Sequence, residues 1–368
     1  MTFKKHQILR QLHYLAIIFF LIRATFFDKY IFTIIGIIIG LTIFALQLSR
    51  LNIYKNSFIY IILAATAAII TYYNNGFFDG LIFFPMTLAC VGIAKSIHEN
   101  GISHKFTIII FYFLTLYFFI NIFFGVYPDN IFSNSRNHIS AMFINLFALI
   151  VISSHINKIK LNFVHCIVLL ICCLLSLGVS GVVVSLFIFF ASFQYKYLKF
   201  FTRHISAHLI FNLILITFFL IFWSYPQTLI ELYSEEGSDL RIKYSKSLVD
   251  IYMSNPRHLI NMEYLRSLDF KNFILGKNLN FEISGFHNFH NSLIILHARA
   301  GIFIFGFIIF FIYALIKNFY KHFMLYVCLL AILLRSLTDT ILFSGYHYEY
   351  IYIYLLLFSY KEKFKNKA

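Results

Sequence analysis

The sequence predicts an all-α polytopic membrane protein, a single multi-pass domain over residues 1–368, and three observations support this fold class. The composition is 60% hydrophobic and 12% charged with a mean hydropathy of +0.80, whereas soluble domains are roughly half apolar and a quarter charged. Apolar runs of span length recur from one end of the chain to the other. Basic residues collect in alternate short segments between these runs, which is typical of multi-pass proteins.

The apolar runs predict about twelve transmembrane helices, because each is long enough for a helix to cross the hydrocarbon core. In chain order they cover 12–27, 30–48, 57–73, 80–95, 106–126, 138–153, 162–177, 179–194, 208–224, 292–316, 323–342 and 346–360. The two runs on either side of Gly178 can also be interpreted as one broken hairpin. The basic N-terminal flank has no small-residue cleavage site after it, so the first run is expected to be a retained signal anchor.

The distribution of basic residues predicts the orientation of the chain. Eighteen of the thirty Lys and Arg residues lie in the terminal segments and in alternate short connections, which the positive-inside rule makes cytoplasmic. Both termini are then cytoplasmic, and the long polar segment 225–286 is an external, periplasmic loop that we expect to fold as short helices. The net charge of +15 therefore reflects orientation in a lipid bilayer, and no nucleic acid is expected as a partner.

Arginine is distributed differently from lysine. Most lysines fall on the cytoplasmic side, whereas seven of the arginines lie outside or within the membrane: Arg23, Arg136, Arg241, Arg257, Arg266, Arg299 and Arg335. A guanidinium stays charged and binds phosphate with two parallel hydrogen bonds, so this pattern favours an anionic ligand such as a lipid phosphate in the outer leaflet. The alternative is that these arginines pair with Asp and Glu or extend to headgroups.

Several common kinds of site are not indicated by the sequence. The five cysteines lie inside apolar runs without zinc-type or redox spacing, so they are interpreted as packing residues. The sequence has no phosphate-binding loop of the Walker A kind and no dinucleotide-binding glycine pattern. We therefore expect neither a cofactor nor a bound metal.

Two polar clusters precede helices on the external side. The first is Asn134-Ser135-Arg136-Asn137-His138, which opens the sixth predicted span and is either an oriented arginine or a capped helix start. The second is Ser238-Asp239-Leu240-Arg241, where Ser238 is a candidate N-cap. Arg241 would then lie in the first turn of an amphipathic helix that runs to about Met253.

A third cluster, at residues 287–301, leads into the tenth predicted span. On a continuous helix His290 and His297 share a face, and Asn291 is about a third of a turn away. Arg299 is about half a turn from His290, so it lines the same cavity only if the helix breaks near Gly301. For His287 and His297 the alternative is interfacial anchoring or hydrogen bonding between helices. Charged and polar groups at the mouth of a span suggest chemistry or transport.

The fourth cluster lies within the eleventh predicted span. Arg335 and Asp339 are one turn apart and share a helix face. One interpretation is an ion pair that makes insertion of the helix tolerable. The other is a phosphate-binding arginine that Asp339 holds in place.

These motifs resemble those of bacterial O-antigen polymerases and ligases. His290-Asn291-Ser292-Leu293, followed by Gly301, is similar to the His-Asn-Ser signature of that family, and Ile274-Leu275-Gly276 is similar to its upstream Ile-Leu-Gly element. Ser135-Arg136-Asn137-His138 is similar to the Ser-Arg-Asn element of the polymerases. One element departs from the pattern: Gly178-Val179-Ser180-Gly181 has Val179 where many relatives carry arginine. Either that arginine is dispensable in this chain or another arginine takes its place.

The resemblance implies a GT-C-like fold and an inverting, metal-independent sugar transfer in the bacterial inner membrane. Its substrates would be glycans on undecaprenyl pyrophosphate, and a chain-length regulator is a further candidate partner. His290 would act as the base, with Arg136 and Arg241 beside it in catalysis. The remaining candidates, for binding of the pyrophosphate or glycan, are Arg335, Asn291, Asp339, His287 and Arg299.

Polymerase is preferred over ligase because of Ser135-Arg136-Asn137-His138. A lipid-glycan flippase or transporter is the alternative from another class. Transporters often consist of two repeated halves with broken helices at mid-membrane, and this sequence shows no such repeat.

Overall fold

The protein is helical throughout the part of the chain that the structure describes, and no strand occurs in that part. The computed structural model describes residues 2–26, 30–48, 55–75, 77–132, 136–176, 178–198, 203–215, 217, 256–278, 291–337 and 348–360. The predicted all-α class is therefore confirmed for these residues.

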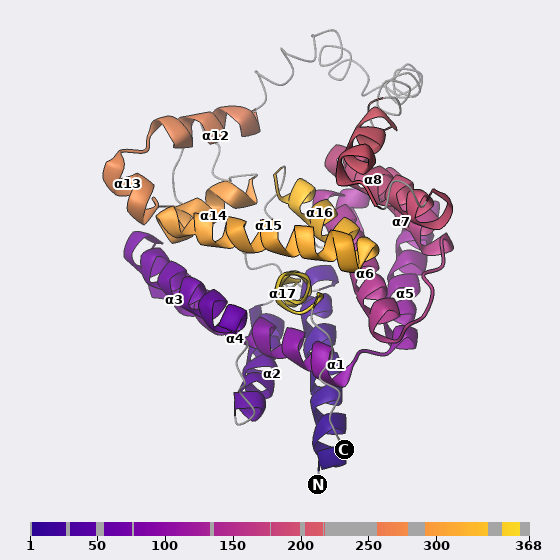
Figure 1. Ribbon diagram of the computed structural model, residues 1–368, viewed down its shortest axis with the longest axis horizontal. Coiled ribbons are helices and arrows are strands. Elements are labelled where there is room, and N and C mark those ends of the chain that lie inside the picture. Colours follow the sequence, from indigo (N-terminus) through magenta and orange to yellow (C-terminus); the bar gives the residue numbers. More distant parts are fainter. Residues whose placement is uncertain are drawn as a thin grey trace.

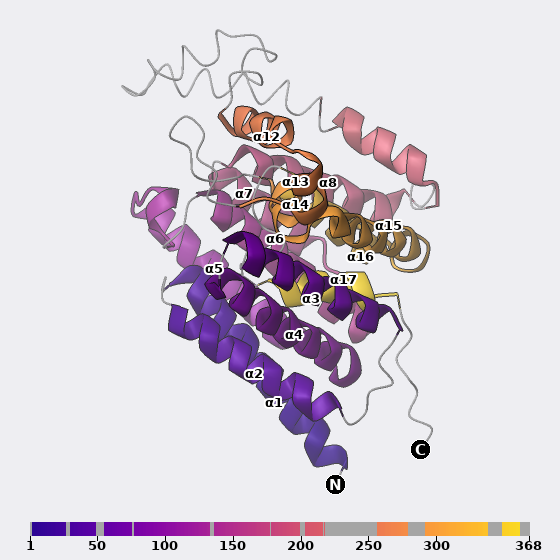
Figure 2. The same cartoon turned by 90° about the vertical axis from the view of Figure 1, so that its left-hand side faces the viewer.

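Four N-terminal helices pack side by side: α1 (Thr2–Thr25), α2 (Tyr30–Leu48), α3 (Lys55–Asn75) and α4 (Phe77–Asn100) (Figures 1 and 2). Small residues allow α2 and α4 to approach closely. A Cβ atom at Gly40 would lie 2.6 Å from the Cβ of Ala89, and one at Gly92 would lie 2.9 Å from the Gly40 carbonyl oxygen. Close contact between small residues is the usual way in which helices associate in lipid.

A second group consists of α5 (His104–Phe123), the short 3-10 helix η1 (Pro128–Asn130), α6 (Arg136–Ile156), α7 (Val164–Leu175) and α8 (Val179–Tyr197). Helix α6 is central, since 89% of its apolar window is buried. Helices α7 and α8 are separate and pack on each other, with Gly178 at the N-cap of α8. The two runs around Gly178 thus form a helical hairpin.

The C-terminal helices connect the two groups. Helix α16 (Phe323–Ser336) packs on α6 and α8, and also on α15 (Ile304–Lys321). Helix α17 (Glu349–Leu357) packs mainly on α4, and all nine of its residues are buried. In Figure 1, α17 is seen end-on among the surrounding helices.

The predicted external loop and the helix that follows it form an interrupted run of short helices. Its described part contains α12 (Pro256–Arg266) and α13 (Phe270–Leu275), which agrees with the expectation of short helices there. Helix α14 (Ser292–Ala300) is separated from α15 by the 3-10 turn η2 (Gly301–Phe303). The helix therefore does break at Gly301, which is the condition stated above for Arg299 to line the same cavity as His290. Since His290 lies outside the described residues, the shared cavity stays a prediction. Helix α12 lies beyond α14, at the end away from α1 and α2 (Figure 2).

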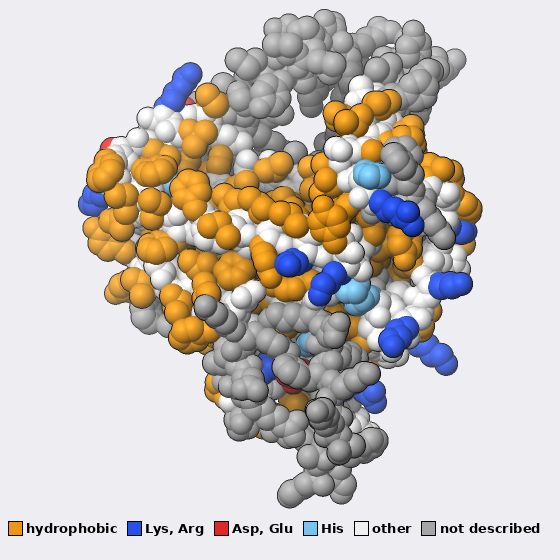
Figure 3. All heavy atoms as spheres, in the orientation of Figure 1, with side chains coloured by type: hydrophobic (Ala, Val, Ile, Leu, Met, Phe, Trp, Pro, Cys, Tyr) orange, Lys and Arg blue, Asp and Glu red, His pale blue; other side chains and the backbone are white. Residues whose placement is uncertain are grey.

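The distribution of side chains is that of a protein surrounded by lipid. On α2 the buried residues include Thr33, Gly36 and Gln47, whereas Ile34 and Ile38 are more than half exposed. Figure 3 shows hydrophobic side chains over much of one face, with Lys and Arg side chains gathered beside the end of α15. An apolar surface of this extent is unfavourable in water and suits a bilayer.

Six helical segments within the described residues are long and apolar enough to cross a membrane. They are His6–Thr25, Tyr30–Leu48, Asn56–Asn74, His104–Phe123, His138–Ile156 and Ser292–Lys321. The other six predicted spans overlap α4, α7, α8, the helix at Ile205–Leu215, α16 and α17, several of which are shorter. The structure thus supports several membrane-crossing helices, and the count of twelve stays a prediction.

Candidate functional site

Among the described residues, Arg335 is the charged residue that lies most completely inside the helix bundle. It lies in the last turn of α16 and its side chain is 0% exposed. Its Nη1 group donates a hydrogen bond to Ser180 Oγ of α8, and its Nη2 group donates to Ser140 Oγ of α6 at 3.0 Å. Three helices therefore fix the plane of this guanidinium. These two bonds to uncharged hydroxyl groups orient the guanidinium.

The backbone at this point explains why the two serines meet. Gly181 faces Ser140, and a Cβ atom at Gly181 would overlap the Ser140 side chain. Glycine therefore permits the close approach of α8 to α6 that places both hydroxyls within reach of Arg335. The Gly178-Val179-Ser180-Gly181 element thus supplies a hydrogen-bond acceptor at Ser180 and a close helix contact at Gly181.

The first turn of α6 lies beside this cluster. The helix begins at Arg136, and Ser140 is one turn further along the same face. The backbone of Arg136 is therefore about 6 Å along the helix axis from the serine that Arg335 contacts. Two of the predicted arginines thus belong to neighbouring positions in the fold, although they are far apart in the sequence.

The His-Asn-Ser segment forms a helix start. Asn291 is the N-cap of α14, and its Oδ1 accepts hydrogen bonds from the backbone N–H of Leu293 at 2.9 Å and of Ile294 at 3.4 Å. Ser292 is fully buried. The structure therefore assigns Asn291 a capping role that the sequence-based prediction did not include. Its predicted binding role would have to use the amide nitrogen.

Two glycines hold the Ile-Leu-Gly element against this helix. Gly276 and Gly301 both have positive φ, at 73° and 53°, which glycine adopts without strain. A Cβ atom at Gly276 would overlap the carbonyl oxygens of His297 and Ala298, and one at Gly301 would overlap that of Ile274. The two motif segments, which are separate in the sequence, are thus in backbone contact.

The side chains of α3 secure the same junction. Asn74 donates from Nδ2 to the Leu275 carbonyl oxygen at 2.7 Å, and Thr71 Oγ1 lies 3.4 Å from the Arg299 carbonyl oxygen. The Arg299 guanidinium stacks over the ring of Phe83 on α4, 5.6 Å from its centroid. Arg299 therefore contacts α3 and α4, whereas Arg335 contacts α6 and α8. These contacts of the two predicted residues involve different helices.

His297 connects the loop to the membrane helices. Its Nε2 donates to the Phe273 carbonyl oxygen at 3.1 Å, so its Nδ1 accepts from the Tyr264 hydroxyl at 2.8 Å. Burial raises the pKa of Tyr264, which keeps this phenol protonated and able to donate. The interpretation of His297 as an interhelical hydrogen-bonding residue is therefore confirmed.

The other predicted site residues lie wholly or partly outside the part of the chain that the structure describes. Arg241, His287, His290 and Asp339 lie outside the described residues, as does the amphipathic helix expected from Ser238 to Met253. For Arg136 only the backbone is described. The predicted ion pair of Arg335 with Asp339 and the predicted convergence of Arg136, Arg241 and Arg335 therefore stay predictions.

Sequence reasoning missed three polar residues that lie inside the bundle, two of them buried and one partly buried. Ser140 is fully buried and Ser180 is partly buried, and together they form the acceptor pair for Arg335. Ser140 follows Arg136 by four residues, which was the available signal. Glu349 is 4% exposed, near Tyr60 and Cys90, and an acid at membrane depth is a functional candidate in its own right.

Comparison with protein-family models, with curated proteins and with solved structures finds no match for this chain. The assignment of a function therefore depends on the residues and their geometry.

Proposed function

We propose that this protein is a polysaccharide polymerase of the inner membrane. It transfers a growing O-antigen or capsular glycan from undecaprenyl pyrophosphate to a sugar hydroxyl of a new lipid-linked repeat unit. The motif resemblance suggests this reaction, and the buried arginine supports it on physical grounds.

The chemistry explains why a fixed arginine is useful. The hydroxyl oxygen of the acceptor sugar attacks the anomeric carbon of the donor glycan, and the bond from that carbon to the pyrophosphate oxygen breaks. The electron pair leaves with undecaprenyl pyrophosphate, and the hydroxyl proton passes to a base, for which His290 is the candidate. Negative charge develops on the leaving group, and an arginine held in place beforehand stabilises that charge without reorganising.

One observation carries the proposal: Arg335 is fixed beside Ser180, the residue that follows Val179. Many proteins of the family that this chain resembles carry arginine at the position of Val179. In the fold, Arg335 brings a guanidinium to the same element from another helix. This arrangement favours the second alternative of the sequence argument, in which a different arginine takes over the role.

A complementation experiment tests this assignment. In a strain that lacks the gene, Arg335→Ala and Arg335→Lys should both remove the ladder of long glycans, because an ammonium does not reproduce two parallel hydrogen bonds. Val179→Arg combined with Arg335→Ala should restore part of the ladder. Arg266→Lys is the matched control, since Arg266 is exposed at the end of α12.

The same glycan profile separates the alternatives. Loss of long chains with one repeat unit still attached indicates a polymerase. Loss of every repeat unit indicates a ligase, which transfers to lipid A core, or a flippase. A normal ladder in Arg335→Ala, with normal protein level, would contradict the proposed role of Arg335.

A further inference from the structure

A large cavity lies at the other end of the helices that hold Arg335. Its volume is about 1690 Å³, and residues from α6, α7, α8, α15 and α16 line it. On α6, α8 and α16 the lining residues His155, Lys196 and Phe323 are 12 to 16 residues from Ser140, Ser180 and Arg335. This spacing corresponds to about 18 to 24 Å along the helices, so the cavity and Arg335 lie toward opposite faces of the bilayer.

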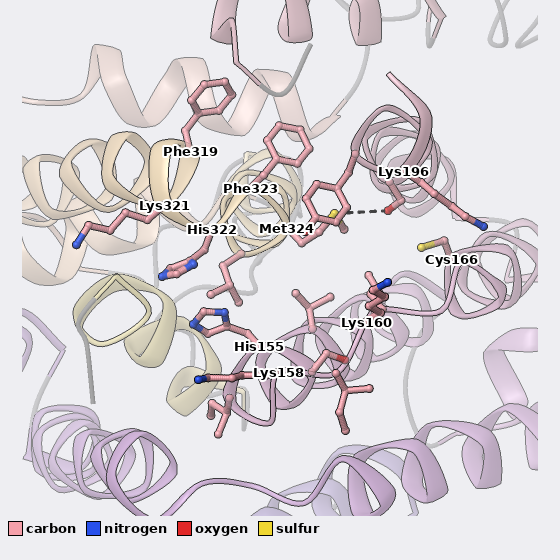
Figure 4. A pocket seen from close by; sticks show the side chains of 18 of the residues that line it. His155, Lys158, Lys160, Cys166, Lys196, Phe319, Lys321, His322, Phe323 and Met324 are labelled. Atoms are coloured by element: carbon pink, nitrogen blue, oxygen red, sulfur yellow. Dashed lines mark hydrogen bonds between the residues drawn. The ribbon is translucent and has the colours of Figure 1, made fainter. Parts of the chain in front are cut away.

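The polar lining of this cavity is basic. Five Lys and Arg residues and three His residues contribute, and the described lining residues include neither Asp nor Glu: Lys158, Lys160, Lys196, Arg203, Lys321, His98, His155 and His322. The rings of His155 and His322 are in contact, with centroids 4.0 Å apart and planes tilted by 56°. Lys158 and Lys321 extend on the same side of them (Figure 4). Such a concentration of positive charge favours an anion.

The other walls are apolar. Phe163, Phe323, Met324 and Leu325 line the cavity together with Val151. A small hydrophilic anion gains nothing from such walls, whereas an amphiphile places its head among the lysines and its chains against the rings and aliphatic groups. The combination of both surfaces therefore indicates a lipid with an anionic head.

Lys158 has an unusual backbone for its residue type. Among the described residues other than glycine, Lys158 is the one with a positive φ, at 56°. It lies in the turn that follows α6. Glycine or asparagine adopts this conformation at lower energy. The presence of lysine at such a position is consistent with a use for its ammonium group in the cavity.

We propose that this cavity binds the phosphate headgroup of an anionic phospholipid of the cytoplasmic leaflet, with preference for a headgroup that carries two phosphates. The cytoplasmic placement follows from the positive-inside rule, and basic pockets between helices on that side suit such headgroups. The assignment uses only the cavity and its charges, so it does not depend on the reaction proposed above.

Binding of defined lipids to the purified full-length protein in neutral detergent tests the assignment. Native mass spectrometry should show cardiolipin retained more strongly than phosphatidylglycerol, and phosphatidylethanolamine least. Lys158→Asn combined with Lys160→Gln should weaken cardiolipin binding at least tenfold. Asparagine tolerates the Lys158 backbone, so this variant removes charge without adding strain.

The matched control is on α15. Lys317 is exposed one turn before Lys321, with its ammonium over Tyr313 and outside the cavity lining. Lys317→Gln should leave cardiolipin binding within twofold of the native protein, whereas Lys321→Gln should weaken it. Equal loss in both variants, or no loss in the Lys158 and Lys160 variant, would overturn the assignment. Inorganic pyrophosphate that displaces cardiolipin at equal concentration would also overturn it, because the ligand would then be a soluble anion.

Discussion

At the scale of single residues, the central feature is an arginine within a membrane bundle. A charged group at this depth is costly unless protein groups contact it, so its position is informative. The sequence already marked Arg335 as a phosphate-binding candidate. It did not identify Ser140 and Ser180 as its partners, because contacts between distant helices leave no local pattern in the chain.

The two serines provide the first prediction. Ser140→Ala and Ser180→Ala each remove one hydrogen bond to a charged group, and such bonds contribute about 1.5–3 kcal/mol. The double variant should insert normally, lose thermal stability and reduce long-chain glycan at least tenfold, because the guanidinium is no longer held in one orientation. Gel profiles of surface glycan and thermal unfolding in detergent measure the two effects. An unchanged glycan ladder in the double variant would show that the orientation of Arg335 is unimportant.

His322 provides a prediction about pH. Burial, and to a smaller extent the charge of Lys321, lower the pKa of His322 from its ordinary value of 6.5. An unfolded chain therefore takes up this proton before the folded one does. The contribution of neutral His322 to the free energy of unfolding is therefore fully present above pH 6.5. It is lost as the pH falls from 6.5 toward the lower pKa of the folded state.

The groups that line the cavity around His322 are cationic or titratable: His155 from α6, Lys321 from α15, and Lys158 from the turn after α6. Lys160 lines the same cavity farther away. A bound anion should raise the pKa of His322 and flatten this dependence. Thermal unfolding between pH 7.5 and 5.0 should thus show a steeper loss for the native protein than for His322→Gln, and cardiolipin should reduce the difference. Identical slopes in the two proteins would refute this account of His322.

At the scale of elements, the sequence predicted the helices better than the joints between them. Long apolar runs gave most helix positions, because burial and length dominate in lipid. Gly301 was identified as a candidate break, yet its contact with Ile274 depends on how the loop folds back. The hydrogen bonds from Asn74 to Leu275 and from Tyr264 to His297 likewise join segments that no local pattern relates.

The junction at which Gly276 and Gly301 bring the 274–276 segment against α14 should tolerate no side chain at either glycine. Gly276→Ala and Gly301→Ala each combine an unfavourable positive φ with overlap on a backbone oxygen. Each should therefore lower the free energy of unfolding by about 2 kcal/mol or more. Gly125→Ala is the matched control, because Gly125 has φ of 77° with open space around its Cβ position. That control should cost about 1 kcal/mol, from the backbone alone. Comparable protein levels and melting temperatures in all three variants would show that the junction is not tightly packed.

At the scale of the whole molecule, the same three helices, α6, α8 and α16, serve two sites. At one end they provide Arg335 and the two serines that bind it, and at the other end they line the basic cavity. In the predicted topology, lysines stay inside and arginines serve the outer half, which would place the cavity on the cytoplasmic side and Arg335 on the external side. An anionic lipid at the inner end would brace the helices whose outer ends hold the guanidinium.

The orientation can be tested with engineered cysteines, since all five native cysteines are buried. Phe270 on α13 is 81% exposed and Lys105 near the start of α5 is exposed. A maleimide that does not cross membranes should label Phe270→Cys in intact spheroplasts. It should label Lys105→Cys only after permeabilisation. The reverse pattern would place the loop in the cytoplasm and exclude an external glycan site.

The most direct test of the central claim uses the purified protein in liposomes with undecaprenyl-pyrophosphate-linked repeat units. The account predicts glycans longer than one unit, with release of undecaprenyl pyrophosphate, for the native protein and for Arg266→Lys. Arg335→Ala should form none, although it binds cardiolipin as the native protein does. Movement of the lipid-linked glycan across the bilayer without any chain extension would contradict a polymerase and identify a transporter.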